Sequence, residues 1–161
     1  MDFRFTPEQE QFRDSVLRFS KDHLSETALQ RAHAPGYPFD VARLMAKQGL
    51  LGITLAEADG GQGGTLLDAV LAIEAVAAAC PRSADVVQAG NFGPIRVLAE
   101  YGSPFHKKSY LKKLLSGESV ISTGSAVVGE QKARKSGMVF AQRKPKLGFC
   151  RAKTWPENFS W

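Results

Sequence analysis

The residue types that can carry out chemistry are scattered along this 161-residue chain without forming a complete catalytic group. His23, His33 and His106 have no metal-ligand spacing to one another or to a cysteine, so we expect each at the surface or in a loop. No segment has the form of a nucleophile elbow, and no two carboxylates are placed as an acid–base pair. The sequence therefore predicts neither a metal site nor a self-sufficient active site.

Two basic or glycine-rich clusters are candidates for anion binding. The glycines at 60–64 precede a helix start at Thr65, which is the geometry that binds phosphate. They follow no convincing strand, however, and they lack both the Gly-x-Gly-x-x-Gly spacing and a Lys-Ser/Thr ending, which favours a mobile connecting loop. Lys107, Lys108, Lys112 and Lys113 share a helix and can bind a nucleotide phosphate, but they are also typical of the solvent face of an amphipathic helix.

Charge divides the chain at about residue 128. Residues 1–127 carry 13 Lys+Arg against 14 Asp+Glu, whereas residues 128–161 carry eight against two. Basic residues mixed with aromatics, here Phe140, Phe149, Trp155 and Trp161, can bind single-stranded nucleic acid. Apolar residues in this region are sparse and without period, so we favour a disordered or non-native tail and do not expect nucleic-acid binding.

The two cysteines and the apolar pattern indicate the compartment. Cys80 ends a predicted helix and Cys150 falls in the dissimilar tail, so we expect two free thiols in a reducing cytoplasm rather than a disulfide. The N-terminus has no signal-peptide pattern, and no run of about 18 apolar residues predicts a membrane span.

The elements that would position any site are helical. Thr6, Pro7 and Gln9 form a predicted capping box, and apolar residues then recur at helical spacing. The helix over 66–79 is apolar on nearly all sides, so we expect it to be the most buried. The pattern predicts an all-α bundle of five or six helices, at 7–24, 39–48, 66–79, 83–92, 94–101 and 104–115, and a strand beginning near 120.

Read in order, these segments resemble the N-terminal helical domain of the acyl-CoA dehydrogenase family. The resemblance covers residues 3–124, and five motifs in the family's order carry it. They are Phe-Thr-Pro-Glu-Gln (5–9) with Phe-Arg-Asp-Ser-Val (12–16), the stretch at 44–53, Gly-Gly-Gln-Gly (60–63) leading into Leu-Leu-Asp-Ala (66–69), Tyr-Gly-Ser (101–103), and Tyr-Leu (110–111) through Ser-Gly-Glu (116–118).

The resemblance implies a function and a set of site residues. Family members use FAD to dehydrogenate acyl-CoA thioesters, and a glutamate from their C-terminal part removes the α-proton. Carried over by position, Gln88, Asn91 and Phe92 are expected in the acyl pocket, and Ser122, Thr123 and Ser125 are expected to contact the flavin. The complete enzyme is expected to be a homo-oligomer.

This chain departs from the family pattern after residue 124. The Thr-Glu-Pro that family members usually show there is missing, and beyond residue 128 the likeness ends. We therefore expect an N-terminal helical domain at 1–120, the remnant of a first β-domain strand at 121–127 and an unrelated basic tail at 128–161. Such a chain is expected to be inactive alone and to bind FAD poorly. The alternative is a non-catalytic helical interaction module whose tail binds an acidic partner or nucleic acid.

Overall fold

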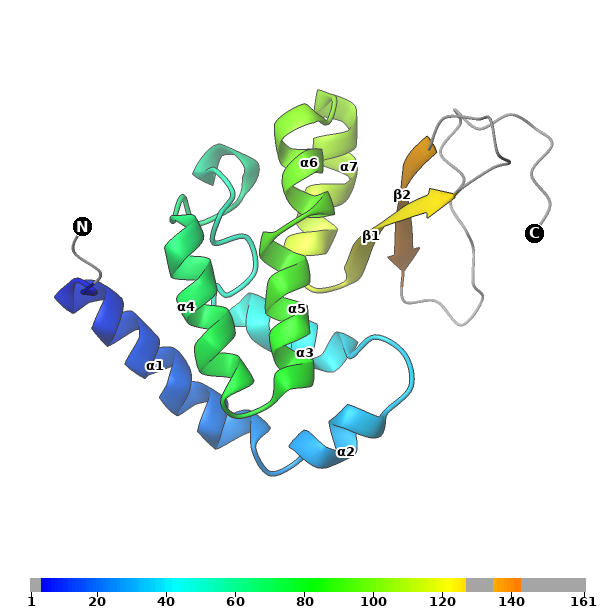
Figure 1. Cartoon of the computed structure of the whole chain (residues 1–161). Helices are drawn as coiled ribbons and strands as arrows, with labels where there is room; N and C mark the ends of the chain where they lie inside the picture. Colours follow the sequence, from blue (N-terminus) through cyan, green and yellow to red (C-terminus); the bar gives the residue numbers. More distant parts are fainter. Residues whose placement is uncertain (1–3, 127–134, 143–161) are drawn as a thin grey trace.

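The computed structural model describes residues 4–126 and 135–142. Figure 1 shows a helical bundle that continues into a two-stranded hairpin. Within these residues the elements are α1 (Pro7–Leu24), α2 (Ala28–His33), α3 (Phe39–Lys47), a 3-10 turn η1 (Glu57–Asp59), α4 (Leu66–Ala77), α5 (Pro81–Asn91), α6 (Pro94–Tyr101), α7 (Pro104–Leu115), β1 (Ser119–Ala126) and β2 (Lys135–Gln142).

Side-chain capping hydrogen bonds mark the starts of α1, α4 and α7. The Thr6 hydroxyl accepts a hydrogen bond from the Gln9 N–H (3.2 Å), and the Gln9 side chain accepts one from the Thr6 N–H (3.0 Å). The same reciprocal arrangement joins Thr65 and Asp68 at the start of α4. The six predicted helices are all present, and their ends differ from the predicted ones by two residues at most. The short α2 was not predicted as a separate helix.

Two apolar clusters form the core. The larger one joins α1, α3, α4, α5 and the segment 50–53, and includes Leu24, Met45 and Val76. The smaller one joins α6, α7 and β1 through side chains that include Leu98, Leu111 and Ile121. The second cluster therefore fixes the strand against the helical bundle.

The prediction that the helix at 66–79 is the most buried is wrong, because α4 has five buried residues against six in the shorter α5. α4 packs against α1 and α5 mainly through small side chains, which include Ala69, Ala72 and Ala75. On its other side, Leu66, Leu67 and Val70 are 50%, 44% and 49% exposed. An all-apolar circumference shows that a helix can be buried, but not which of its faces a neighbour covers.

The glycine segment is held in place by backbone hydrogen bonds, so the prediction of a mobile loop is also wrong. The N–H groups of residues 61–64 donate to the carbonyl oxygens of residues 56, 52, 55 and 53, over distances of 2.7–3.0 Å. A side chain at Gly61 would collide with the Leu55 carbonyl oxygen, so the close backbone approach requires glycine there. Because these N–H groups already have partners, they are not available to hold a phosphate.

The predicted strand is present as β1, and it pairs antiparallel with β2 from Ser119 opposite Gln142 to Ala126 opposite Lys135. The sequence did not predict β2, which lies within the segment expected to be an irregular tail. Residues 127–134 and 143–161, including Cys150, lie outside the described residues, so for them the tail prediction stays a prediction. No helix in the described part of the chain is both long and apolar enough to cross a bilayer.

Candidate functional site

The three predicted pocket residues sit at the C-terminal end of α5, on different faces. Pro81 begins this helix, and Gly93, with a φ of 64°, turns the chain from α5 into α6. Gln88 is exposed, Phe92 is half-buried against the larger core, and Asn91 is fully buried. Gln88 lies on the exposed side of α5 and Asn91 faces inward, whereas Phe92 follows the helix as its extended C-cap residue.

Asn91 binds α5 to the segment that connects α3 with η1. Its side-chain Nδ2 donates to the carbonyl oxygens of Leu50 and Val87, both at 2.8 Å, and its Oδ1 accepts from the Thr54 N–H at 3.4 Å. The Thr54 hydroxyl in turn donates to the Asn91 carbonyl oxygen at 2.5 Å. All polar atoms of the Asn91 amide are therefore engaged inside the protein, which makes Asn91 a positioning residue for the end of α5. Sequence reasoning missed Thr54, for which no local motif gives a signal.

A close backbone contact completes this junction. The Gly52 N–H donates to the Gly90 carbonyl oxygen at 2.9 Å, and a Cβ at Gly90 would lie 2.6 Å from a Leu51 methyl group. Both hydrogen bonds and close packing therefore hold the end of α5 to the segment 50–54. Gln88 and Phe92 are presented on a rigid scaffold as a result.

The predicted flavin-contacting residues lie on β1, which packs against α5, α6 and α7. Ser122 is exposed. Thr123 and Ser125 pair through the backbone with Met138 and Ser136 on β2, and their side chains lie outside the described part of the structure. The structure therefore brings the two predicted residue groups onto neighbouring elements.

The space between α5 and β1 is closed by side chains. Its volume is about 10 Å³, and its lining includes Tyr37, Leu51, Ile95 and Ile121. Burial raises the pKa of Tyr37 to about 12, because the phenolate would lose its hydration there. Gln88, Phe92 and Ser122 do not line this space.

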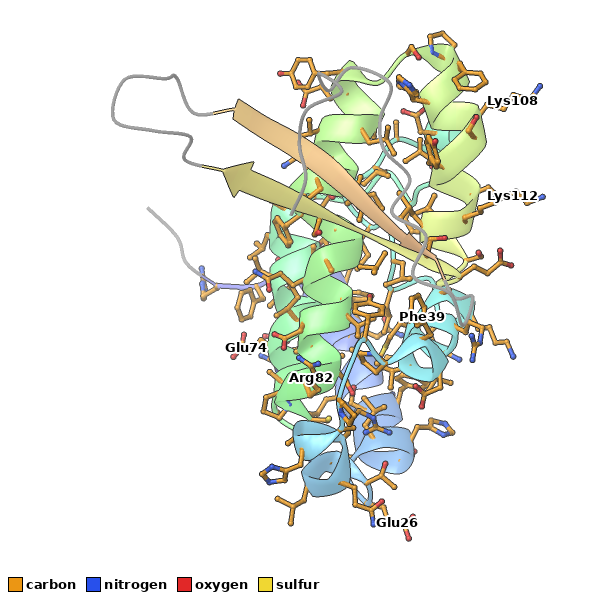
Figure 2. The ribbon with its side chains drawn as sticks, turned by 90° about the vertical axis from the view of Figure 1, so that its right-hand side faces the viewer. Glu26, Phe39, Glu74, Arg82, Lys108 and Lys112 are labelled. Atoms are coloured by element: carbon orange, nitrogen blue, oxygen red, sulfur yellow. The ribbon has the colours of Figure 1, made fainter. Side chains whose placement is uncertain are left out.

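The lysine-rich helix α7 borders a wider groove. This groove, of about 510 Å³, lies between η1 and α7 and has Leu111 and Leu115 at its apolar side. Lys107 Nζ makes an ion pair with Asp59 Oδ2 at 3.0 Å across one end. Figure 2 shows Lys108 and Lys112 projecting from the outer edge of α7 to the same side, away from the bundle. The solvent-face interpretation of the lysines holds for this pair, whereas Lys107 ties α7 to η1.

The remaining reactive side chains do not form a site. His23, His33 and His106 are exposed, as predicted, and the described residues contain no His/Cys/Asp/Glu cluster that can hold a metal. Cys80 is buried, with the Ser83 hydroxyl 3.1 Å and an Arg31 guanidinium nitrogen 3.6 Å from its sulfur. Burial raises the pKa of the Cys80 thiol, but the hydrogen bonds from Ser83 and Arg31 outweigh it and leave the pKa below its usual value.

Comparison with known proteins places this geometry in context. Residues 6–118 match the family described as "Acyl-CoA dehydrogenase, N-terminal domain". A 3-sulfinopropanoyl-CoA desulfinase of Paraburkholderia xenovorans is 29% identical over 116 residues, which are 72% of this chain and 30% of the relative. A short-chain specific acyl-CoA dehydrogenase of Clostridium acetobutylicum is 27% identical over 124 residues, 77% of this chain and 33% of the relative.

Solved structures agree in fold. A glutaryl-CoA dehydrogenase from Mycobacterium smegmatis in complex with FADH2 superimposes with a TM-score of 0.65 at 19% identity, covering 72% of this chain and 30% of the other. The chain thus spans about a third of the length of the curated relatives it matches. Its similarity to them is confined to their N-terminal region.

Proposed function

Since this chain belongs to the acyl-CoA dehydrogenase family through its N-terminal domain, we propose that it forms one wall of the acyl-CoA site of a flavin-dependent dehydrogenase. The reaction is the removal of two hydrogens from the α and β carbons of an acyl-CoA thioester. The match of residues 6–118 to the family carries this proposal. The complete enzyme is a homo-oligomer of the cytoplasm.

The end of α5 is the proposed wall. Gln88 offers an amide to solvent and the half-buried Phe92, at the end of the same helix, supplies an apolar side chain, a combination suited to a thioester with an apolar chain. Asn91 does not contact the substrate in this arrangement. Its hydrogen bonds to Leu50, Val87 and Thr54 hold the helix end on which Gln88 and Phe92 are carried.

The described residues alone do not fit FAD. The space between α5 and β1 is about 10 Å³, far too small for an isoalloxazine ring, and Ser122 contributes a single exposed hydroxyl. Among these residues, moreover, the buried polar side chains are Ser20, Ser83, Asn91 and Ser119, none of which is a carboxylate base. We therefore assign the flavin site and the base to other parts of a complete enzyme and expect the isolated chain to be inactive.

A titration of the purified chain with FAD tests whether the isolated chain lacks a flavin site. We expect no stoichiometric binding of FAD and no reduction of an artificial electron acceptor by acyl-CoA. The short-chain specific acyl-CoA dehydrogenase of Clostridium acetobutylicum serves as the positive control. A stable yellow complex of the isolated chain would contradict the proposal, because it would place a complete flavin site within these 161 residues.

A chimera tests the acyl-pocket wall. Residues 1–124 replace the matching N-terminal region of the Clostridium acetobutylicum enzyme, and acyl-CoA dehydrogenation is measured with thioesters of increasing chain length. In an active chimera, Phe92→Ala is expected to change KM for the longer thioesters several-fold, because it removes an apolar contact along the chain. Leu29→Ala, at an exposed position on α2, is the matched control and should change nothing. Equal kinetics for both variants would show that Phe92 does not line the acyl pocket.

The interaction-module alternative rests on the charge of residues 128–161. It requires salt-dependent binding to an acidic partner or nucleic acid that is lost when these residues are deleted. Such binding by a chain whose chimera is inactive would favour the module over the dehydrogenase.

A further inference from the structure

Two strongly exposed aromatic side chains stand at the turn between α6 and α7. Tyr101 is the last residue of α6 and is 75% exposed, and Phe105 lies in the first turn of α7 and is 70% exposed. Figure 1 shows the two helices side by side, with their turn projecting beyond the rest of the bundle and α2 at the opposite end. Two exposed aromatic side chains gathered at one turn can mark a surface that contacts a partner or a membrane.

Unpaired cations follow these rings along the same helix. Lys108 and Lys112 lie three and seven residues after Phe105 and so fall on the same stripe of α7. Both are exposed, and neither forms an ion pair with any residue that the structure describes. Figure 2 shows their side chains projecting in one direction. Lys107, one position away, is instead neutralised by Asp59 at 3.0 Å.

The order of the two rings and the two lysines along the axis of α7 matches the layers of a membrane surface. With a rise of about 1.5 Å per residue, Lys108 lies about 4.5 Å and Lys112 about 10.5 Å behind Phe105 along the helix. The polar interface on each side of a bilayer is about 5–8 Å thick. Rings placed at the acyl boundary would therefore put both ammonium groups at the level of the lipid phosphates, with the lysine stems extended.

We propose that the α6–α7 turn docks on an anionic lipid surface, with Tyr101 and Phe105 entering the interface and Lys108 and Lys112 contacting lipid phosphates. Two carboxylates are exposed nearby: Glu100, which stands beside the Tyr101 hydroxyl, and Glu57 on η1. They oppose the attraction only in part, because two unpaired lysines face the same surface. The docking is peripheral and reversible, since two rings and two charges give a modest membrane affinity.

Binding to vesicles, measured by sedimentation, tests the docking. The full chain is mixed with phosphatidylcholine vesicles that contain or lack phosphatidylserine. Lys108→Gln with Lys112→Gln is expected to weaken binding to the anionic vesicles about fivefold per lysine. Tyr101→Ser with Phe105→Ser is expected to weaken it at least about tenfold. The basic segment 128–161 is the same in every variant, so its own attraction to the vesicles cancels in the comparison.

A local fluorescence probe separates docking of this turn from attraction of the tail. In a Cys150→Ser background, an environment-sensitive fluorophore is attached at Phe105→Cys and, as the matched control, at Leu29→Cys, which is 75% exposed on α2. We expect a blue shift on anionic vesicles for the probe at 105 and none at 29. Equal shifts at both positions, or no loss of binding in the aromatic variant, would overturn the proposal. A blue shift at 105 with a single-stranded oligonucleotide but not with vesicles would overturn it in favour of nucleic-acid stacking.

Discussion

Replacement of Asn91 by alanine is the sharpest test of how α5 is held. The substitution removes two hydrogen bonds of 2.8 Å, to the Leu50 and Val87 carbonyl oxygens, and one longer bond of 3.4 Å from the Thr54 N–H. Asn91 is fully buried, so water does not readily replace these partners. At about 1 kcal/mol for each hydrogen bond, with an added penalty for stranded buried groups, we expect a loss of about 3 kcal/mol.

Urea unfolding followed by circular dichroism measures this loss. For a domain of this size it corresponds to a fall in the midpoint of about 1–2 M urea. Gln88→Ala, on the exposed side of the same helix, is the matched control and should stay within about 0.5 kcal/mol of the parent. Asn91→Asp keeps the shape but turns a carboxylate oxygen toward two carbonyl oxygens, so we expect it to destabilise at least as much as alanine.

A loss of less than about 0.5 kcal/mol for Asn91→Ala, with an unchanged slope, would contradict the anchoring role of Asn91, since removal of a buried amide with three protein partners should cost more than that. A double-mutant cycle with Thr54→Ala provides a further check. Thr54 donates both hydrogen bonds between the two residues, its N–H to Asn91 Oδ1 at 3.4 Å and its hydroxyl to the Asn91 carbonyl oxygen at 2.5 Å. Each substitution removes a different one of these bonds, and each bond holds the backbone groups in place for the other, so the two effects should be non-additive by about 0.5–1.5 kcal/mol. Strict additivity would mean that the junction does not act as a unit.

Three further outcomes are expected. Gly117→Ala should destabilise the protein by more than about 2 kcal/mol, because the φ of Gly117 is 71° and a Cβ there would lie 2.5 Å from the backbone of α3. Gly36 has a similar φ of 78° but open space around it, so Gly36→Ala should cost only about 1 kcal/mol. Equal losses for the two variants in thermal unfolding would exclude the steric explanation. Asp68→Ala should cost about 1 kcal/mol, because the Asp68 carboxylate no longer accepts hydrogen bonds from the Thr65 N–H and hydroxyl. Hydrogen bonds from the Thr65 N–H and hydroxyl lower the pKa of Asp68, so this contribution is present above the ordinary carboxyl pKa and disappears as pH falls through the lowered one; an acid titration of stability that is identical in parent and variant would refute it. Burial raises the pKa of Tyr37 to about 12 in the folded state, against about 10 when unfolded. The free energy of unfolding should therefore hold below pH 10 and fall by up to about 2 kcal/mol as pH rises toward 12. In urea titrations at alkaline pH, the stability of Tyr37→Phe should change less with pH.

The capping and breaking signals in the sequence were sufficient to predict six of the seven α-helices that the structure describes. Thr6 with Gln9, and Thr65 with Asp68, act over three residues, and Pro81, Pro94 and Pro104 each occupy a first helical turn. Such interactions are local, so their outcome does not depend on the remainder of the fold. Five short motifs in order were likewise sufficient to indicate the family, which the match over residues 6–118 confirms.

Long-range contacts decided what the sequence could not. Thr54 is 37 residues from Asn91, and Asp59 is 48 residues from Lys107, so no local pattern predicts either pairing. Glycines at 60–64 indicate flexibility in isolation, but here they permit the backbone to approach residues 52–56 and become fixed by it. The assignments of Gln88, Phe92 and Ser122 remain predictions, because side chains from the rest of a complete enzyme would define the pocket.

The sequence by itself determined where helices begin and end, because capping and proline geometry act within a single turn. Only the tertiary structure decided which apolar faces are covered. α4 is apolar on nearly all sides, yet Leu66 and Val70 stay about half exposed, while the polar Asn91 is completely buried. Hydrophobicity sets the free energy gained when a helix face is covered, but the position of neighbouring elements determines whether that face is covered. A buried amide is tolerated only where groups from distant segments form hydrogen bonds with it.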